Sequence, residues 1–220
     1  MLLKHMTLRR YTRIRDVLIK RQYDLTILAE DVYKPHNLSA MLRSCDAVGI
    51  AKAHAINPTG GVPTYNETSA SADKWVELQT HEALEPALSS LRSQNMKLYA
   101  AHLSSSALDY RALDYTEPTC ILFGNERSGV SERAAEAADA HIIVPMLGMV
   151  ESLNVSVATA VILFEAQRQR LAAGKYDVSQ LGPQALNARL FELLYPRAAK
   201  ELKNQGLPYP VIDEAELADS

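Results

Sequence analysis

Cysteine is scarce in this sequence, and the histidines are not arranged for metal binding. Cys45 and Cys120 are the only cysteines, far apart and each among apolar neighbours. Neither a disulfide framework nor a cysteine-based zinc site is therefore indicated, and a reducing cytoplasm is expected. The six histidines lack the HxxxH, HExxH and paired spacings that are typical of zinc ligands. We accordingly expect no metal.

Long hydrophobic runs are missing as well. No run approaches the length that crosses a membrane, and the first fifteen residues carry Lys4 and four arginines instead of the apolar stretch of a secretory signal. We expect no association with a membrane. The 220 residues, of which 47% are hydrophobic, suffice for one α/β domain with a core and a modest appendage.

Three common motifs of catalysis and cofactor binding are also absent. The sequence contains no GxGxxG of a dinucleotide fold, no Lys-Ser/Thr after a phosphate-binding glycine loop, and no GxSxG elbow of a serine hydrolase. An oxidoreductase with a nucleotide cofactor and a Ser-His-Asp hydrolase are therefore disfavoured.

The net charge of −3 conceals an uneven distribution of charge. Residues 1–21 hold seven Lys or Arg against one acid, and residues 165–205 hold seven against four. Residues 22–164 are acidic, with nine basic and seventeen acidic side chains. Because phosphate binding needs a local basic surface rather than a basic average, the two basic ends are candidate RNA contacts. Solvated helix faces are the alternative.

Hydrophobic periodicity divides the chain into alternating strands and helices. Apolar residues at helical spacing, with arginines between them, predict an amphipathic helix over residues 7–21. The alternation that follows is typical of an α/β fold with a mainly parallel sheet. Predicted strands occupy residues 25–29, 53–56, 75–79, 97–102, 119–123 and 141–144, and further predicted helices occupy 37–49, 82–94, 131–138, 152–173 and 184–204.

These elements suggest three parts of the chain. Residues 1–22 form a basic N-terminal helical extension, residues 23–174 a central domain, and residues 175–220 a C-terminal helical extension with a tail. Residues 57–73 form a long loop rich in Gly, Pro, Ser and Thr. Loops of this length are usually functional or mobile, and a surface loop without a role is the alternative.

The first segment that can carry chemistry runs from Lys34 to Arg43. It follows a predicted strand and opens a helix, with Asn37 as the expected N-cap. Arg43 lies on a different face of that helix from Leu38 and Met41, so its guanidinium is expected to be free to bind a phosphate. An ordinary cap followed by a surface arginine is the alternative.

The second segment is Ile121-Leu-Phe-Gly-Asn-Glu-Arg-Ser-Gly129, a buried strand that enters a tight turn with one acid between two glycines. Glycines at the carboxyl end of a strand let the backbone approach a ligand, and this is the end at which open α/β sheets bind. Glu126 is expected to hold donors of a ligand or a partner. In the alternative, it only caps the next helix.

The third segment covers residues 143–160, in which a strand meets a glycine loop and then a helix that begins in small polar residues. Ser152, Asn154, Ser156 and Thr159 lie among valines and alanines. Their small side chains allow the helix to present hydroxyls to a ligand or, in the alternative, to pack closely against other backbone.

In this order and at these separations, the three segments resemble the motifs of the SpoU/TrmH family of SPOUT methyltransferases. The resemblance covers about residues 9–176 and recurs at Gly206-Leu-Pro-Tyr-Pro210. It implies a parallel sheet with a deep C-terminal trefoil knot, in which the loop after Val144 and the helix from Ser152 pass through an earlier loop. Periodicity alone could not indicate a knot, because knots violate the usual rules of chain connection.

The resemblance also implies a reaction and a site. The family transfers a methyl group from S-adenosyl-L-methionine to a ribose 2′-hydroxyl, and guanosine 18 in the D-loop of tRNA is the expected target. The active site is expected to form across a homodimer, with Arg43 as the catalytic residue supported by Asn37, Glu126, Ser152 and Asn154. The cofactor is expected at positions that it contacts largely through the backbone: Ala101, Leu122, Gly124, Val144, Met146 and Leu153.

Arginine normally stays protonated, so we expect Arg43 to position the RNA phosphate and polarise the hydroxyl rather than to remove its proton. The loop 57–73 has no Lys or Arg, so phosphate contacts are expected from the two ends of the chain. The expected RNA-binding residues are Arg9, Arg10, Arg13, Arg189, Arg197, Lys200 and Lys203. Methylation of ribosomal RNA or of another tRNA nucleotide, and a non-catalytic RNA-binding factor on the same fold, are the alternatives.

Overall fold

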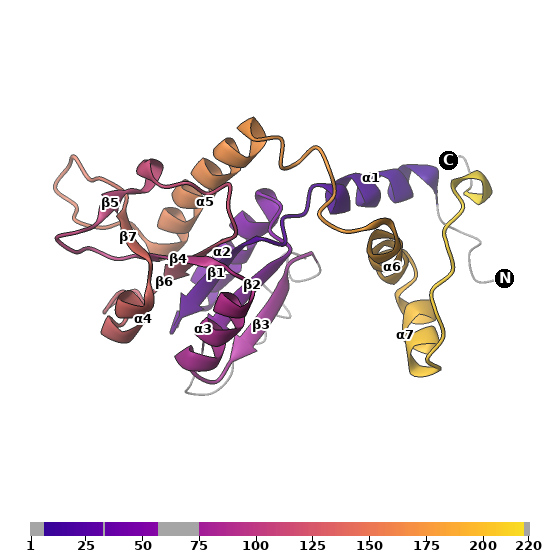
Figure 1. Ribbon diagram of the computed structural model, residues 1–220, viewed down its shortest axis with the longest axis horizontal. Helices are drawn as coiled ribbons and strands as arrows, with labels where there is room; N and C mark the ends of the chain where they lie inside the picture. The colour runs from indigo at the N-terminus through magenta and orange to yellow at the C-terminus, as the bar shows by residue number, and fades with distance from the viewer. Residues whose placement is uncertain (1–6, 33, 57–74, 218–220) are drawn as a thin grey trace. The chain divides into compact units, whose positions relative to one another are not determined.

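The computed structural model describes residues 7–32, 34–56 and 75–217. It divides into two compact units, one comprising residues 22–175 and the other residues 1–21 with 176–220 (Figure 1). The loop 57–73 lies outside the described residues. Among those that are described, no helix is both long and apolar enough to span a bilayer.

The larger unit is built on a seven-stranded sheet in the order β3-β2-β1-β6-β4-β7-β5, and every pairing between these strands is parallel. The predicted parallel sheet is therefore confirmed. The two central strands, β1 and β6, are buried along their whole length, as strands covered on both faces are. The strands are β1 (Leu25–Glu30), β2 (Lys52–Ile56), β3 (Glu77–His81), β4 (Lys97–Ala101), β5 (Leu108–Asp109), β6 (Thr119–Phe123) and β7 (Ala140–Ile143).

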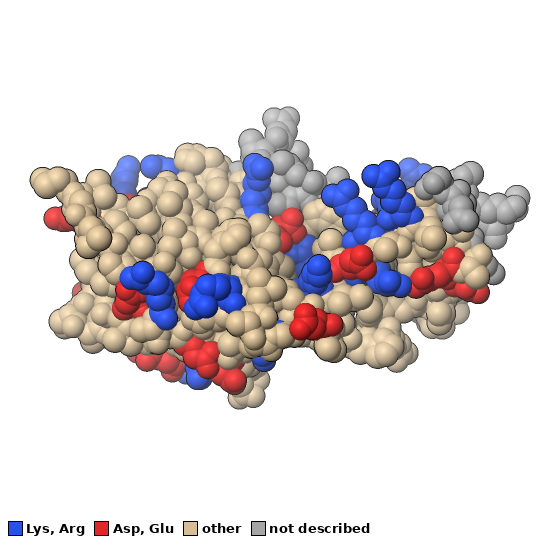
Figure 2. All heavy atoms as spheres, turned by 90° about the horizontal axis from the view of Figure 1, so that it is seen from above, with Lys and Arg blue, Asp and Glu red and all other residues tan. Residues whose placement is uncertain are grey.

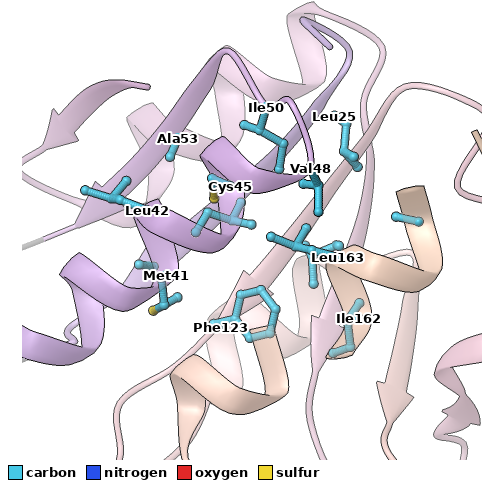
Figure 3. Packing of buried hydrophobic residues seen from close by; sticks show 14 of the residues in the cluster. Leu25, Met41, Leu42, Cys45, Val48, Ile50, Ala53, Phe123, Ile162 and Leu163 are labelled. Atoms are coloured by element: carbon cyan, nitrogen blue, oxygen red, sulfur yellow. The ribbon is translucent and has the colours of Figure 1, made fainter. Parts of the chain in front are cut away.

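Helices cover both faces of this sheet. Residues of α2 (Pro35–Ala47) and α5 (Val155–Ala172) share one hydrophobic cluster with alternate residues of the central strands, and Figure 3 shows Met41 of α2 and Ile162 of α5 on either side of Phe123. Residues of α3 (Leu84–Ser93) and α4 (Glu132–Ala137) share a second cluster with the intervening strand residues. Each large side chain that is fully buried in this way contributes about 1.5–3 kcal/mol.

Several boundaries differ from the sequence-based expectation. The expected N-cap at Asn37 is wrong: α2 begins at Pro35, which is suited to the first helical position, so Asn37 lies inside the first turn and is buried. Helix α5 begins at Val155 rather than at residue 152, with Asn154 as its N-cap. The strand expected at 75–79 is shifted to Glu77–His81, an edge strand whose mixed exposure leaves little apolar pattern to mark it. Strand β5 and the 3-10 helix η2 (Tyr110–Ala112) were not expected.

The smaller unit is helical. Helix α1 (Leu8–Ile19) lies within the helix predicted over residues 7–21, buries Tyr11, Ile14 and Leu18, and packs against α6 (Pro183–Leu194). The single helix expected over 184–204 is two helices, because Pro196 lacks the N–H that would continue α6 and instead begins α7 (Pro196–Asn204). The last element that the structure describes is the 3-10 helix η3 (Glu214–Glu216).

A pair of neighbouring histidines, of which His54 is buried, makes the stability of the larger unit depend on pH. His54 of β2 is 2% exposed, and its Nδ1 lies 3.0 Å from Nε2 of His81 on β3. Burial, and then the positive charges of His81 and Lys52, lower the pKa of His54 from 6.5 to about 4. Between pH 6.5 and about pH 4, His54 is protonated in the unfolded chain but neutral in the folded chain. The free energy of unfolding therefore decreases as the pH falls through this range.

We therefore expect the free energy of unfolding to fall by about 2 kcal/mol between pH 7 and pH 5 on account of His54. Urea denaturation at the two pH values measures the change. The variant His54→Gln removes the titrating group and should show a correspondingly smaller loss. An equal loss in the variant and the wild type would contradict this role of His54.

Candidate functional site

A cavity of about 780 Å³ opens at the carboxyl ends of the strands in the larger unit. Its walls are the chain just after β4, the chain from the end of β6, and the chain that leads from β7 into α5. Because the carboxyl ends of parallel strands share one edge, this is where an open α/β sheet binds its ligands. Five of the six positions expected to hold the cofactor line it: Ala101, Gly124, Val144, Met146 and Leu153.

The sixth position, Leu122, does not line the cavity. Its side chain is 1% exposed and packs in the cluster shared with α3 and α4. Its backbone pairs in register with Leu28 and Ala100 inside the sheet. Leu122 therefore lies within the sheet, one residue before Phe123, which does line the cavity.

The loop after β6 closes on itself as a small hairpin. Asn125 N donates to Gly129 O at 3.0 Å, and Gly129 N donates to Asn125 O at 2.8 Å. Gly129 closes the hairpin with φ +71°, a left-handed value that glycine adopts without a steric penalty. Glu126 is the first of the three residues at the tip, where it lines the cavity.

Three predicted site residues from three separate segments are bonded to one another. Asn37 Nδ2 donates to Glu126 Oε1 at 2.5 Å, and Asn154 Nδ2 donates to Asn37 Oδ1 at 3.2 Å. Asn154 Oδ1 in turn accepts from Ser156 N at 2.8 Å, which ties the chain of bonds to the start of α5. The side chain of Asn37 is thereby held between the other two.

The charge of Glu126 is set by the same neighbours. Burial raises the pKa of its carboxyl, but the hydrogen bond from Asn37, the backbone hydrogen bonds from Glu126 and Lys34, and the positive charge of Lys34 together outweigh burial, so this pKa lies below its usual value. Glu126 is therefore a carboxylate at neutral pH and acts as a hydrogen-bond acceptor. Sequence reasoning missed Lys34, although its place immediately before Pro35 at the start of a helix could have indicated it.

The remaining two predicted residues are placed differently. Ser152 lines the cavity, as expected. Arg43 is exposed on α2 while Leu38, Met41 and Leu42 are buried, so its side chain points away from the core as predicted. It is not among the residues that line the cavity, and it makes no ion pair with any residue of the described chain. The structure thus leaves its guanidinium available to another molecule.

The predicted RNA-binding residues lie on the helical unit. Arg9, Arg10 and Arg13 are exposed on α1, and the basic residues of α7 are exposed as well. Arg189 of α6 is half-buried and pairs with Glu192 at 2.9 Å, so part of its charge is already neutralised. Figure 2 shows Lys and Arg side chains on the surface of this unit, with acidic side chains among them.

The described residues contain no group of three or more His, Cys, Asp or Glu side chains that could hold a metal ion.

Comparison with known proteins places these features in a family. Residues 24–164 match the SpoU rRNA Methylase family, and residues 168–215 match the C-terminal family of SpoU rRNA methylases. The chain is 59% identical over 175 residues to the tRNA (guanosine(18)-2′-O)-methyltransferase of Thermus thermophilus, covering 80% of this chain and 90% of the relative. It is 48% identical over 207 residues to the enzyme of the same name from Escherichia coli, covering 93% and 90%.

Solved structures agree with the sequence comparison. The crystal structure of the A. aeolicus TrmH/SpoU tRNA modifying enzyme matches with a TM-score of 0.80 and 39% identity, covering 86% of this chain and 96% of that one. The SpoU methyltransferase AviRb from Streptomyces viridochromogenes, in complex with the cofactor AdoMet, matches with a TM-score of 0.63 and 25% identity, covering 70% and 64%. With the parallel sheet, the cavity and the bonded motif residues already in place, these matches show that the chain belongs to the SpoU rRNA methylase family.

Proposed function

We propose that this protein transfers a methyl group from S-adenosyl-L-methionine to the 2′-hydroxyl of guanosine 18 in the D-loop of tRNA. The observation that carries the proposal is the chain of bonds from Glu126 through Asn37 to Asn154 at the edge of the cavity. The names of relatives that are 59% and 48% identical support the choice of tRNA and of guanosine 18. A tRNA substrate implies that the protein works in the cytoplasm.

The cavity fits S-adenosylmethionine. Its volume of about 780 Å³ lies within the range of small-molecule sites. The walls combine apolar side chains such as Phe123 and Ile142 with the backbone of the hairpin and of residues 144–146, which suits a ligand read largely through backbone groups. The family's trefoil knot is part of this proposal, and the meeting of residues 101–103, 123–129, 142–146 and 151–155 around one cavity supports it.

The reaction sets two tasks for the chain's own residues. S-adenosylmethionine supplies a methyl group on a positively charged sulfur. Transfer forms a bond from the ribose oxygen to the methyl carbon, breaks the carbon–sulfur bond and releases the hydroxyl proton. The protein has to hold the oxygen in line with that carbon and assist the loss of the proton. We assign the positioning of the RNA phosphate and the polarising of the hydroxyl to Arg43, with Asn37, Glu126, Ser152 and Asn154 as supports.

A homodimer is the second part of the proposal, because Arg43 does not line the cavity of its own chain. Helix α5 carries exposed apolar residues seven positions apart, Val157, Phe164 and Leu171, which are 47%, 51% and 57% exposed. Leu147 and Met149, in the loop beside the cavity, are fully exposed. Large apolar side chains that gather on a surface are typical of protein–protein interfaces. We propose that a second copy covers them and brings its Arg43 to this cavity.

Mixed dimers test that arrangement. We expect Arg43→Ala and Glu126→Ala each to be inactive alone, and a refolded equimolar mixture to recover about a quarter of the wild-type methyl transfer. Half of the dimers are then mixed, and each of these contains one site with both residues intact. If Arg43 and Glu126 of one site came from the same chain, the mixture would be as inactive as its components. That result would contradict a site shared between two chains.

The basic residues of the helical unit are proposed as the tRNA contacts: Arg9, Arg10, Arg13, Arg189, Arg197, Lys200 and Lys203. Six of the seven are exposed on α1 and α7, which supports this assignment. Contacts to phosphate contribute affinity without regard to sequence and weaken as salt rises. Of the seven, Arg189 is expected to contribute least, since it already pairs with Glu192.

Ribosomal RNA is the second candidate substrate, because the description of the matching family names ribosomal RNA. Incubation of the purified protein with radiolabelled S-adenosylmethionine and, separately, unmodified tRNA and ribosomal RNA fragments distinguishes the two. Label on tRNA supports the proposal. Label on ribosomal RNA alone would support the proposed reaction but show that ribosomal RNA, rather than tRNA, is the substrate. Binding of the cofactor without transfer to either RNA would indicate a non-catalytic RNA-binding factor.

A further inference from the structure

Strand β1 holds the hairpin that carries Glu126 at two points. The last residue of the strand, Glu30, is bonded to the chain that leaves the hairpin. The next residue, Asp31, is bonded to the chain that enters it. Sequence reasoning assigned neither residue a role.

The first of these contacts is made by a buried carboxylate. Glu30 is 8% exposed, and it accepts hydrogen bonds from Ser131 N at 2.9 Å and from Ser131 Oγ at 2.7 Å. Ser131 Oγ also accepts from Ala134 N at 3.2 Å and thereby caps α4. Burying a carboxylate is costly unless its oxygens are bonded, so this pairing fixes Ser131 with respect to the end of β1.

The second contact depends on an unusual backbone conformation. Asp31 has φ +52°, a left-handed value that is uncommon for residues other than glycine. Its carbonyl accepts from Asn125 Nδ2 at 3.2 Å. The other side-chain atom of that amide, Asn125 Oδ1, accepts from Arg127 N at 2.7 Å and so shapes the tip on which Glu126 lies.

The same strand end also leads to the partner of Glu126. Only the short run from Asp31 to Lys34 separates β1 from α2, whose first turn contains Asn37. The end of β1 therefore positions both residues of the hydrogen bond from Asn37 to Glu126. Asn37 is connected to it through the covalent chain, and Glu126 is connected to it through the contacts that Glu30 and Asp31 make with the hairpin. A shift of either anchor changes where the two side chains meet.

We propose that Glu30 is a positioning residue, which acts through Ser131 and the hairpin to set the place of Glu126 against Asn37. The inference rests on the proposed methyl transfer for its kinetic consequence. Under this proposal, the reaction also depends on Glu30, a residue that does not line the cavity.

Substitution of Glu30 tests the proposal by kinetics. We expect Glu30→Ala to lower kcat about ten- to a hundredfold, because small displacements of catalytic groups have effects of this size. Glu30→Gln keeps one acceptor for Ser131 N and should recover part of the loss. The matched control is Asp139→Ala, which removes another carboxylate bonded to backbone, at Leu98 N in the opposite half of β4, and should leave kcat unchanged.

A double substitution separates positioning from a general loss of structure. If Glu30 acts by placing Glu126 against Asn37, Glu30→Ala adds no further loss to the residual activity of Asn37→Ala. A further loss of the same factor in the double variant would overturn the proposal, as would an unchanged kcat in Glu30→Ala.

Amide hydrogen exchange gives a readout that needs no substrate. We expect residues 124–131 to exchange faster in Glu30→Ala and at the wild-type rate in Asp139→Ala. Unchanged exchange in Glu30→Ala would overturn the anchoring role. If the wild type itself transferred no methyl group, the proposed function would fail, and the exchange rates would still decide whether Glu30 holds the hairpin.

Discussion

Gly124→Ala is expected to reduce methyl transfer more than about a hundredfold. A Cβ atom at this position would lie 2.0 Å from the backbone carbon and oxygen of Gly129 and 2.1 Å from Val130 N. These are backbone atoms, so no side chain can swing aside. The two bonds between Asn125 and Gly129 would have to break, and the hairpin would open. Glu126 would then leave Asn37, and one wall of the cavity would move with it.

The assay for Gly124→Ala is methyl transfer together with titration of S-adenosylmethionine, since both should weaken. Gly182→Ala is the matched control, because nothing lies within 4 Å of a Cβ built there. It should behave as the wild type. Retention of full activity by Gly124→Ala would show that the closed hairpin is not needed for the reaction.

Arg170→Ala is expected to lower the free energy of unfolding by about 3–5 kcal/mol. The side chain of Arg170 on α5 is completely buried. Its guanidinium pairs with the Asp24 carboxylate and donates to Gln22 Oε1 at 2.8 Å. It also donates to the carbonyls of Asp24, Tyr115 and Glu117 at 3.1, 2.7 and 3.0 Å. Its loss removes a donor from each of these groups and leaves a cavity where the chain before β1 meets the chain before β6.

Urea denaturation of Arg170→Ala and Arg168→Ala compares a buried arginine with an exposed one two residues away. Arg168 pairs with Glu165 at 2.8 Å, but its side chain is 68% exposed, so its removal should cost no more than about 1 kcal/mol. Equal losses in the two variants would contradict the structural role given to Arg170.

The parallel sheet and its helices could be predicted because their signals are local. Apolar runs separated by amphipathic stretches mark buried strands and covering helices without reference to the rest of the chain. Where competing local signals met, the prediction failed. Asn37 is a good N-cap by type, but Pro35 two residues earlier already begins the helix. Pro196 breaks the helix expected over 184–204, and the sequence contained this signal.

The contacts of the site could be predicted only in part. Resemblance to a family indicated Asn37, Glu126 and Asn154 as one set, but their mutual bonds join residues 89 and 117 positions apart. No local pattern encodes contacts over such separations. The same holds for Glu30 and Ser131, which are 101 positions apart and lie in segments that local reasoning treated separately.

The most direct test of the central claim is to locate the methyl group. Unmodified tRNA is incubated with the protein and S-adenosylmethionine, digested with nuclease, and examined by mass spectrometry, with Glu126→Ala as the inactive control. We expect one added methyl group on the 2′-oxygen of guanosine 18, absent from the control. A methyl group on a base, on another nucleotide, or equally present with Glu126→Ala would contradict it.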